Sequence, residues 1–161
     1  MKKLQKILLV EDNPQDVELT LAALEEYNIA NEVMVVHDGE EALDYLYGRG
    51  RHQERADKKN PVLVLLDLKM PKVDGLQVLE TIKGDPTLSS IPVVMLTSSR
   101  EEPDLARAYH LGVNAYVVKP VDFQSFIDAV RHLGVFWAVI NEPPPGGADD
   151  GRSSTASPFP T

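Results

Sequence analysis

The chain has 161 residues, 43% of them hydrophobic, which is enough for one domain with a single buried core. Its formal net charge of −9 disfavours nucleic acid and anionic membranes as partners, and the absence of cysteine excludes disulfides, thiolate metal sites and a cysteine nucleophile. The basic N-terminus precedes only four apolar residues, too few for a signal peptide or a membrane span, so we expect a cytoplasmic protein.

The first half of the chain alternates between short apolar runs, typical of buried strands, and segments with the apolar spacing of helices. Asn13 is a good helix cap and Pro14 suits a first helical position. Asp38, followed three residues later by Glu41, is a second capping pattern. In chain order we predict a strand at residues 7–10, a helix after Asn13, a strand at 32–36, a helix at 42–46 and a loop at 48–60.

The second half continues the alternation. Ser99 with Glu102 forms a capping box, and Gly112 is a typical helix stop. After residue 141 the chain is rich in Pro, Gly and Ser, so we expect residues 142–161 to be a disordered tail and residues 1–141 to be one domain. In chain order we predict a strand at 62–66, a helix at 75–82, a strand at 93–96, a helix from Ser99 to Gly112, a strand at 115–118 and a helix at 122–140.

Five strands and five helices in βα repeats predict an α/β fold with a doubly wound parallel sheet. Right-handed crossovers leave few topologies, of which the flavodoxin-like order 2-1-3-4-5 is the commonest. In such a sheet the carboxyl ends of the strands share one edge, so polar residues that follow the strands should meet in one crevice. These residues are Glu11, Asp12, Asp67, Thr97 and Lys119.

A phosphoryl-transfer site with a metal is the chemistry that this set predicts. Asp67 follows the most hydrophobic strand, and an aspartate is ionised near neutral pH, so it can attack phosphorus without a general base. Glu11 and Asp12 would repel an anionic donor, and a hard cation such as Mg²⁺ removes that difficulty. We expect these two carboxylates, Asp67 and the backbone carbonyl of Lys69 to hold the ion.

Lys119 and Thr97 would neutralise charge and donate a hydroxyl at the phosphoryl oxygens. We hypothesise a cis peptide bond between Lys119 and Pro120, which would aim the lysine over the crevice. Each of these residues taken alone also fits an ordinary role, since an acidic pair can cap a helix, a lone aspartate can form a turn and most lysines are on the surface. Their joint placement at strand ends favours the functional interpretation.

Five motifs in sequence order resemble the receiver domain of two-component response regulators, over residues 6 to about 140. The resemblance implies a signalling module, not an enzyme, that accepts a phosphoryl group from a phosphohistidine of a sensor histidine kinase, with Mg²⁺ required. Slow self-dephosphorylation is compatible with this role. The motifs are Glu11-Asp12, Asp67, Met70-Pro71 with Asp74-Gly75, Thr97-Ser98, and Gly112 with Tyr116 and Lys119-Pro120.

The resemblance also assigns a role to each residue of the set. Tyr116 and Thr97 would form a switch that alters the face made by the helix at 99–111, the strand at 115–118 and the last helix. By resemblance Asp67 is the phosphoacceptor, the metal is bound by Glu11, Asp12, Asp67 and the Lys69 carbonyl, and the phosphoryl group is contacted by Thr97 and Lys119.

A narrower resemblance is to stand-alone receivers that are paired with phytochrome-type kinases. It rests on the long loop at 48–59 and on Phe136-Trp137 near the end of the last helix. Members of this subgroup tend to dimerise through the last helix and strand. An exposed Phe136-Trp137 patch would suit a homodimer, and burial of the pair in the monomer core is the alternative.

Three other functions are weighed against this one. The receiver could relay its phosphoryl group onward to a histidine phosphotransfer protein. A phosphatase of the haloacid dehalogenase type needs a second carboxylate two residues after the nucleophile, where Lys69 stands. A flavin- or nucleotide-binding domain needs a phosphate-binding loop after the first strand, where Glu11 and Asp12 would repel phosphate in the absence of a metal.

Overall fold

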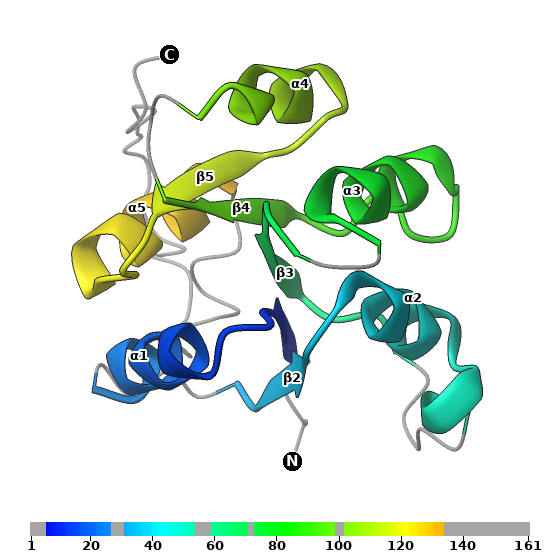
Figure 1. Ribbon diagram of the computed structural model, residues 1–161, viewed down its shortest axis with the longest axis horizontal. Helices are drawn as coiled ribbons and strands as arrows, with labels where there is room; N and C mark the ends of the chain where they lie inside the picture. The colour runs from blue at the N-terminus through cyan, green and yellow to red at the C-terminus, as the bar shows by residue number, and fades with distance from the viewer. Residues whose placement is uncertain (1–5, 27–30, 54–58, 71–72, 99–101, 134–161) are drawn as a thin grey trace, which may run out of the picture.

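A five-stranded parallel sheet with helices on both faces forms the protein (Figure 1). The computed structural model describes residues 6–26, 31–53, 59–70, 73–98 and 102–133. The strand order is β2-β1-β3-β4-β5, which confirms the predicted flavodoxin-like topology. The elements are β1 (Ile7–Val10), α1 (Pro14–Glu26), β2 (Val33–Val36), α2 (Gly39–Tyr47), the 3-10 helix η1 (Gly50–His52), β3 (Leu63–Asp67), α3 (Gly75–Gly84), β4 (Val93–Thr97), α4 (Asp104–His110), β5 (Ala115–Val118) and α5 (Phe123–Leu133).

The three central strands are buried along their whole length because helices cover both faces of the sheet. Every residue of β1, β3 and β4 is buried, which explains their unbroken apolar composition. In the register, Val10 of β1 lies beside Val36 of β2 and Leu66 of β3, so these three strands reach the same edge together. Thr97 of β4 lies beside Val118 of β5 at that edge.

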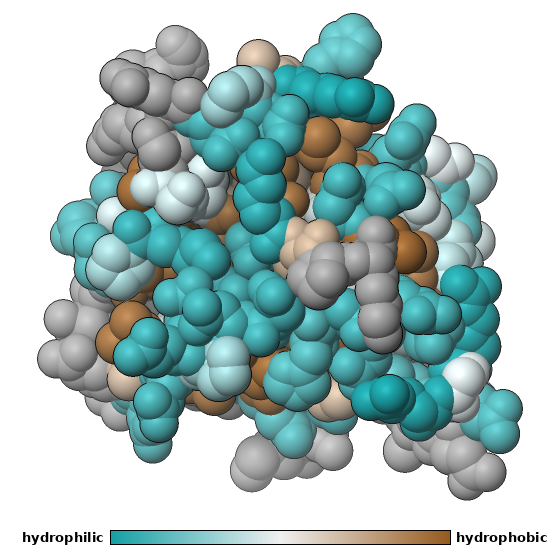
Figure 2. All heavy atoms as spheres, in the orientation of Figure 1, coloured by the Kyte–Doolittle hydropathy of each residue, from teal (hydrophilic) through white to brown (hydrophobic). Residues whose placement is uncertain are grey.

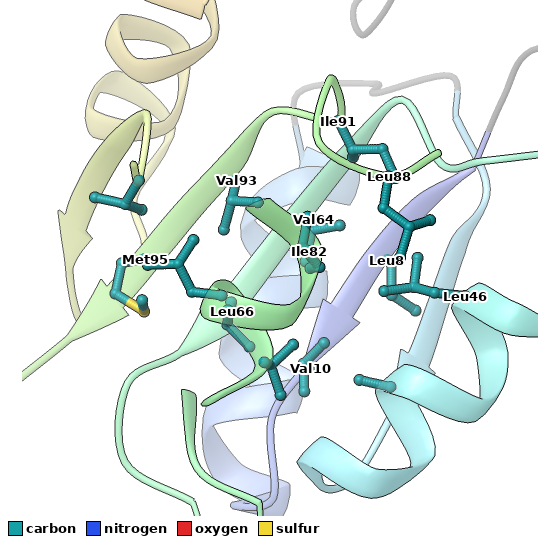
Figure 3. Close-up of a cluster of buried hydrophobic side chains, with 14 of the residues drawn as sticks. Leu8, Val10, Leu46, Val64, Leu66, Ile82, Leu88, Ile91, Val93 and Met95 are labelled. Atoms are coloured by element: carbon teal, nitrogen blue, oxygen red, sulfur yellow. The ribbon is translucent and has the colours of Figure 1, made fainter. Parts of the chain in front are cut away.

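Two apolar clusters, one on each face, form the core. Because successive side chains of a strand point to opposite faces, Leu8 and Val10 join one cluster while Ile7 and Leu9 join the other. The first cluster packs under α2 and α3, as Figure 3 shows for Leu46 and its neighbours. The second cluster packs under α1 and α5. Within the described residues, none of the helices has the length and apolar character needed to cross a membrane.

The start of α3 is fixed against the end of β3. A Cβ atom at Gly75 would overlap the carbonyl oxygen of Asp67, so only glycine allows this close approach. Asp74 accepts a hydrogen bond from the backbone N–H of Gln77, and the Gln77 side chain accepts one from the backbone N–H of Asp74. This capping box positions the loop that follows the predicted phosphoacceptor.

The prediction for the fourth helix was wrong at its start. The described helix begins at Asp104, and its N-cap, Pro103, makes no side-chain capping hydrogen bond. A residue that precedes proline is disfavoured in the helical region, so Glu102 does not open the helix. Ser99 lies outside the described residues. The predicted stop is confirmed, since Gly112 follows the helix with a φ of 103°.

Two further predictions differ from the structure or fall outside it. The segment at 48–60 was predicted as a loop, but it contains the short helix η1. His52 of η1 pairs with Glu41 at 3.0 Å and packs edge-on against Tyr45, contacts that the local sequence does not reveal. Phe136, Trp137 and the predicted tail at 142–161 lie outside the described residues.

Candidate functional site

The carboxyl edge of the sheet holds a cavity that brings together all five residues predicted from the strand ends. The cavity is lined by these five residues together with Asn13, Asp16, Leu68, Lys69 and Ser98. Hydrophilic side chains gather over the middle of the face shown in Figure 2, where β1 and β3 lie in the same view of Figure 1. The site therefore draws on four of the five strands and on the loops that follow them.

Three carboxylates in the cavity form a compact acidic cluster. Oxygen atoms of Glu11, Asp12 and Asp67 lie within 4.8 Å of one another; Glu11 and Asp67 are buried and Asp12 is exposed. Burial, the hydrogen bond with Asp67 and the charge of Asp67 together raise the pKa of Glu11 to about 7, against hydrogen bonds from Lys119 and the Asn13 backbone. An oxygen-only donor set with this excess of negative charge fits a hard divalent cation.

Lys119 also contacts this acidic cluster. Its Nζ donates hydrogen bonds to Asp16 Oδ2 at 2.9 Å and to Glu11 Oε1 at 3.1 Å, and it lies 3.4 Å from Asp67 Oδ1. Burial alone lowers the pKa of this lysine, but the hydrogen bonds and charges of Asp16, Asp67 and Glu11 outweigh burial and raise it above its ordinary value. The ammonium group therefore stays charged in the cavity.

The ends of β4 and β5 are tied together beside the cavity. Thr97 is buried at the end of β4, and its carbonyl accepts a 2.8 Å hydrogen bond from the backbone N–H of Lys119. Ser98 follows it and is exposed. The peptide bond between Lys119 and Pro120 is cis, in agreement with the hypothesis from the sequence. Thr97 and Lys119 thus line one wall of the cavity.

Lys69 lies with its backbone in the site and its side chain outside it. Its backbone N–H donates a long 3.4 Å hydrogen bond to Asp67 Oδ1. Its side chain, 64% exposed, pairs instead with Asp104 at 3.0 Å and with Glu102 at 3.4 Å. The loop after β3 is therefore connected to the start of α4 by two ion pairs.

Tyr116 does not line the cavity. It is half-buried on β5, packs against the core cluster that includes Met95, and lies beside that residue of β4 in the register. Its ring meets that of Tyr109 edge-on, with centroids 6.2 Å apart and planes at 90°. Tyr109 is 47% exposed on α4, so this aromatic pair connects β5 to the surface of α4.

Three of these features were not predicted from the sequence: Asp16, the partners of Lys69 and the ring of Tyr109. Asp16 lies in the first turn of α1 and does not end a strand, and an acidic residue in a first turn is ordinarily explained by the helix dipole. The signal that identifies it is topological, because helix N-termini in a parallel α/β fold meet the carboxyl edge of the sheet. No comparable signal marks Glu102 and Asp104, the partners of Lys69, or the ring of Tyr109.

Comparisons with known proteins agree with this geometry. A family model described as the response regulator receiver domain matches residues 7–131. The solved structure of the bacteriophytochrome response regulator AtBRR is 62% identical, covers 88% of this chain and 100% of its own, and superposes with a TM-score of 0.81. The response regulator Rcp1 of Synechocystis is 38% identical over 81% of this chain and 87% of its own.

Two further structures concern Rcp1 and a related protein. The Mn²⁺-bound form of Rcp1 is 37% identical, covers 83% of this chain and 94% of its own, and has a TM-score of 0.67. The phosphorylated cyanobacterial phytochrome response regulator RcpA is 42% identical, with the same coverages and a TM-score of 0.68. The sheet order, the acidic cluster at its carboxyl edge and the match over residues 7–131 lead to one conclusion: this chain belongs to the response regulator receiver domain family.

Proposed function

We propose that this receiver accepts a phosphoryl group on Asp67 from the phosphohistidine of a sensor histidine kinase. The observation that carries the proposal is the position of Asp67, buried at the end of β3, 3.4 Å from the Lys119 ammonium and within 4.8 Å of two other carboxylates. One cavity thus combines a nucleophile, the Lys119 ammonium and a cluster of carboxylates suited to a metal ion, as phosphoryl transfer requires. The relative RcpA, whose structure is that of a phosphorylated protein, supports this assignment.

The proposed transfer is a direct displacement at phosphorus. One carboxylate oxygen of Asp67 attacks the phosphorus atom, a P–O bond forms, and the P–N bond to the imidazole of the donor breaks. The imidazole nitrogen leaves with the electron pair of that bond. A carboxylate carries no proton, so none has to be removed from the nucleophile. Lys119, held charged by its carboxylate neighbours, would balance the charge on the phosphoryl oxygens, and Thr97 would donate its hydroxyl.

Glu11, Asp12, Asp67 and the backbone carbonyl of Lys69 are the proposed ligands of Mg²⁺. The acidic cluster consists of oxygen donors only. Burial is the largest cause of the raised pKa of Glu11, and the charge of Asp67, which a cation would offset, adds to it. When bound, the ion supplies charge neutralisation at the phosphoryl oxygens. The Mn²⁺-bound form of the relative Rcp1 supports a divalent ion at such a cluster.

The output of the receiver is proposed to pass through the face formed by α4, β5 and α5. Thr97 and Lys119 would sense the phosphoryl group, and the pair of Tyr116 with Tyr109 would carry the change from β5 to α4. The names of AtBRR and RcpA favour a phytochrome-type kinase as the phosphodonor. We also propose that residues 1–141 form the receiver domain and that residues 142–161 are its tail. A homodimer formed through Phe136 and Trp137 stays a prediction.

Intact mass spectrometry after incubation with acetyl phosphate and Mg²⁺ tests the assignment. The wild-type chain should gain one phosphoryl group, and Asp67→Asn should gain none. Asp128→Asn, which changes a carboxylate on α5 that does not line the cavity, is the matched control and should label like the wild type. Chelation of Mg²⁺ should abolish the gain. An unlabelled wild-type chain, or labelling that survives in Asp67→Asn, would contradict the proposal.

A further inference from the structure

Lys119 is shared by three carboxylates, and its closest partner is not the phosphoacceptor. Its Nζ lies 2.9 Å from Asp16, 3.1 Å from Glu11 and 3.4 Å from Asp67. Charge-assisted hydrogen bonds between an ammonium and a carboxylate measure about 2.7–2.9 Å, so only the contact with Asp16 is of full strength. The ammonium is therefore held most strongly by the carboxylate on α1, and its contact with the nucleophile is the longest of the three.

Asp16 is placed by the helix cap of α1. The backbone N–H of Asp16 donates a 3.1 Å hydrogen bond to Asn13 Oδ1, and the neighbouring N–H of Gln15 donates one of 2.9 Å to the same oxygen. This cap orders the first turn of α1. From that turn the Asp16 carboxylate lines the cavity, and its side chain is 29% exposed. Asp16 is not a member of the compact cluster formed by the three carboxylates of the proposed metal site.

We propose that Asp16 is a positioning residue that holds the Lys119 ammonium off Asp67 in the unphosphorylated protein and competes with a phosphoryl group for it. The inference rests on the proposed function of Asp67 as phosphoacceptor. An ammonium has three N–H donors, and Asp16 and Glu11 each accept one of them. A phosphoryl group on Asp67 would bring new anionic oxygens to the side of Lys119 that now faces Asp67 at 3.4 Å.

The competition has a direct functional consequence. The N–H that Lys119 donates to Asp16 is not offered to the phosphoryl oxygens, which are left with the third donor of the ammonium. Asp16 would thus weaken the binding of the phosphoryl group by Lys119, while the Asp67 carboxylate would still be able to attack phosphorus. Removal of its charge should strengthen the binding of a phosphoryl analogue.

Beryllofluoride, a non-covalent analogue of a phosphoryl group on aspartate, is the probe for the first experiment. With Mg²⁺ present, Asp16→Asn should bind it about three- to tenfold more tightly than the wild type, in line with the net contribution of one hydrogen bond. Asp16→Glu, which keeps the carboxylate, should restore an affinity close to that of the wild type. Glu18→Gln removes an exposed charge from the same helix, outside the cavity, and should change nothing.

The same comparison in a Lys119→Met background separates positioning from a general effect of charge. If Asp16 acts through Lys119, Asp16→Asn should have no effect on affinity once the ammonium is gone. A gain that persists in Lys119→Met would mean that any lost negative charge favours the anion, and it would overturn the inference. Equal binding by the wild type and Asp16→Asn would overturn it as well.

Unfolding of the metal-free protein in urea tests the contact without any phosphoryl chemistry. Asp16→Asn should lower the urea midpoint in the wild-type background and leave it unchanged in Lys119→Met, because the lost interaction is the one with the lysine. Additive effects would overturn the inference. A wild-type chain that couples these two residues in urea but binds no beryllofluoride would instead contradict the proposed function, so the two failures are distinguishable.

Discussion

Metal affinity should depend on pH near neutrality because Glu11 titrates in that range. Burial, with the hydrogen bond and charge of Asp67, raises the pKa of Glu11 to about 7 in the metal-free protein. A divalent cation binds the carboxylate and not the carboxylic acid, so protons compete with the cation for this ligand. Affinity should therefore rise as the pH rises through 7 and level off above pH 8.

The magnitude follows from the fraction of Glu11 that is ionised. With a pKa of about 7, roughly ten elevenths of Glu11 carry a charge at pH 8 and roughly one eleventh at pH 6. The apparent affinity for Mg²⁺ or Mn²⁺ should thus fall about tenfold between pH 8 and pH 6, which corresponds to about 1.4 kcal/mol. A glutamate at its ordinary pKa would be ionised at both values and would give almost no change.

Electron paramagnetic resonance of free Mn²⁺ measures this affinity directly, and calorimetry in buffers of different ionisation enthalpy counts the protons released. Close to one proton should leave per ion bound at pH 6, and almost none at pH 8. Glu11→Gln keeps an oxygen donor but cannot be protonated, so its weaker affinity should lose this dependence on pH. An unchanged wild-type affinity between pH 6 and pH 8, or the same slope in Glu11→Gln, would refute the reasoning.

The remaining predictions concern stability, with the urea midpoint as the measurement. Asp74→Ala removes the capping box of α3 and should cost about 1 kcal/mol, and an unchanged midpoint would argue against the cap. Gly39→Ala would push a Cβ into the backbone of Val73 and should cost about 1–3 kcal/mol. In the control Gly84→Ala the new Cβ meets no atom within 4 Å, so this variant should be neutral or stabilising. Equal effects of the two substitutions would contradict the packing at Gly39. Leu66→Ala, fully buried on β3, should cost about 2–5 kcal/mol, and a loss under 1 kcal/mol would show that the core relaxes around it.

Most of the fold was predictable because its strands are buried on both faces. The run Ile7–Val10 cannot be mistaken for an amphipathic strand, and its role in the sheet follows from the alternation with helices. Asn13 with Pro14 marked the start of α1, and the structure confirms that Asn13 Oδ1 caps it. The predicted start of α4 was wrong because Pro103 disfavours a helical conformation at Glu102, the residue before it.

The site was predictable to the extent that its residues end strands. The topology alone brings Asp67, Thr97 and Lys119 to one edge, and the structure places all three along one cavity. Asp16 was not predictable in the same way, because its partner is 103 positions away and lies on another element. Contacts of this kind depend on where the first turn of α1 and the residue that follows β5 meet in the folded chain, which no local pattern encodes.

The contacts of Lys119 have a consequence for the order in which the protein is made. They join residues 103 and 108 positions apart, and β5, which leads to Lys119, pairs with β4 at the edge of the sheet. A nascent chain that contains only the first four strands carries Glu11, Asp12 and Asp67 without the lysine that offsets their repulsion. The acidic cluster should therefore gain its counter-charge only when the segment that follows β5 has been added.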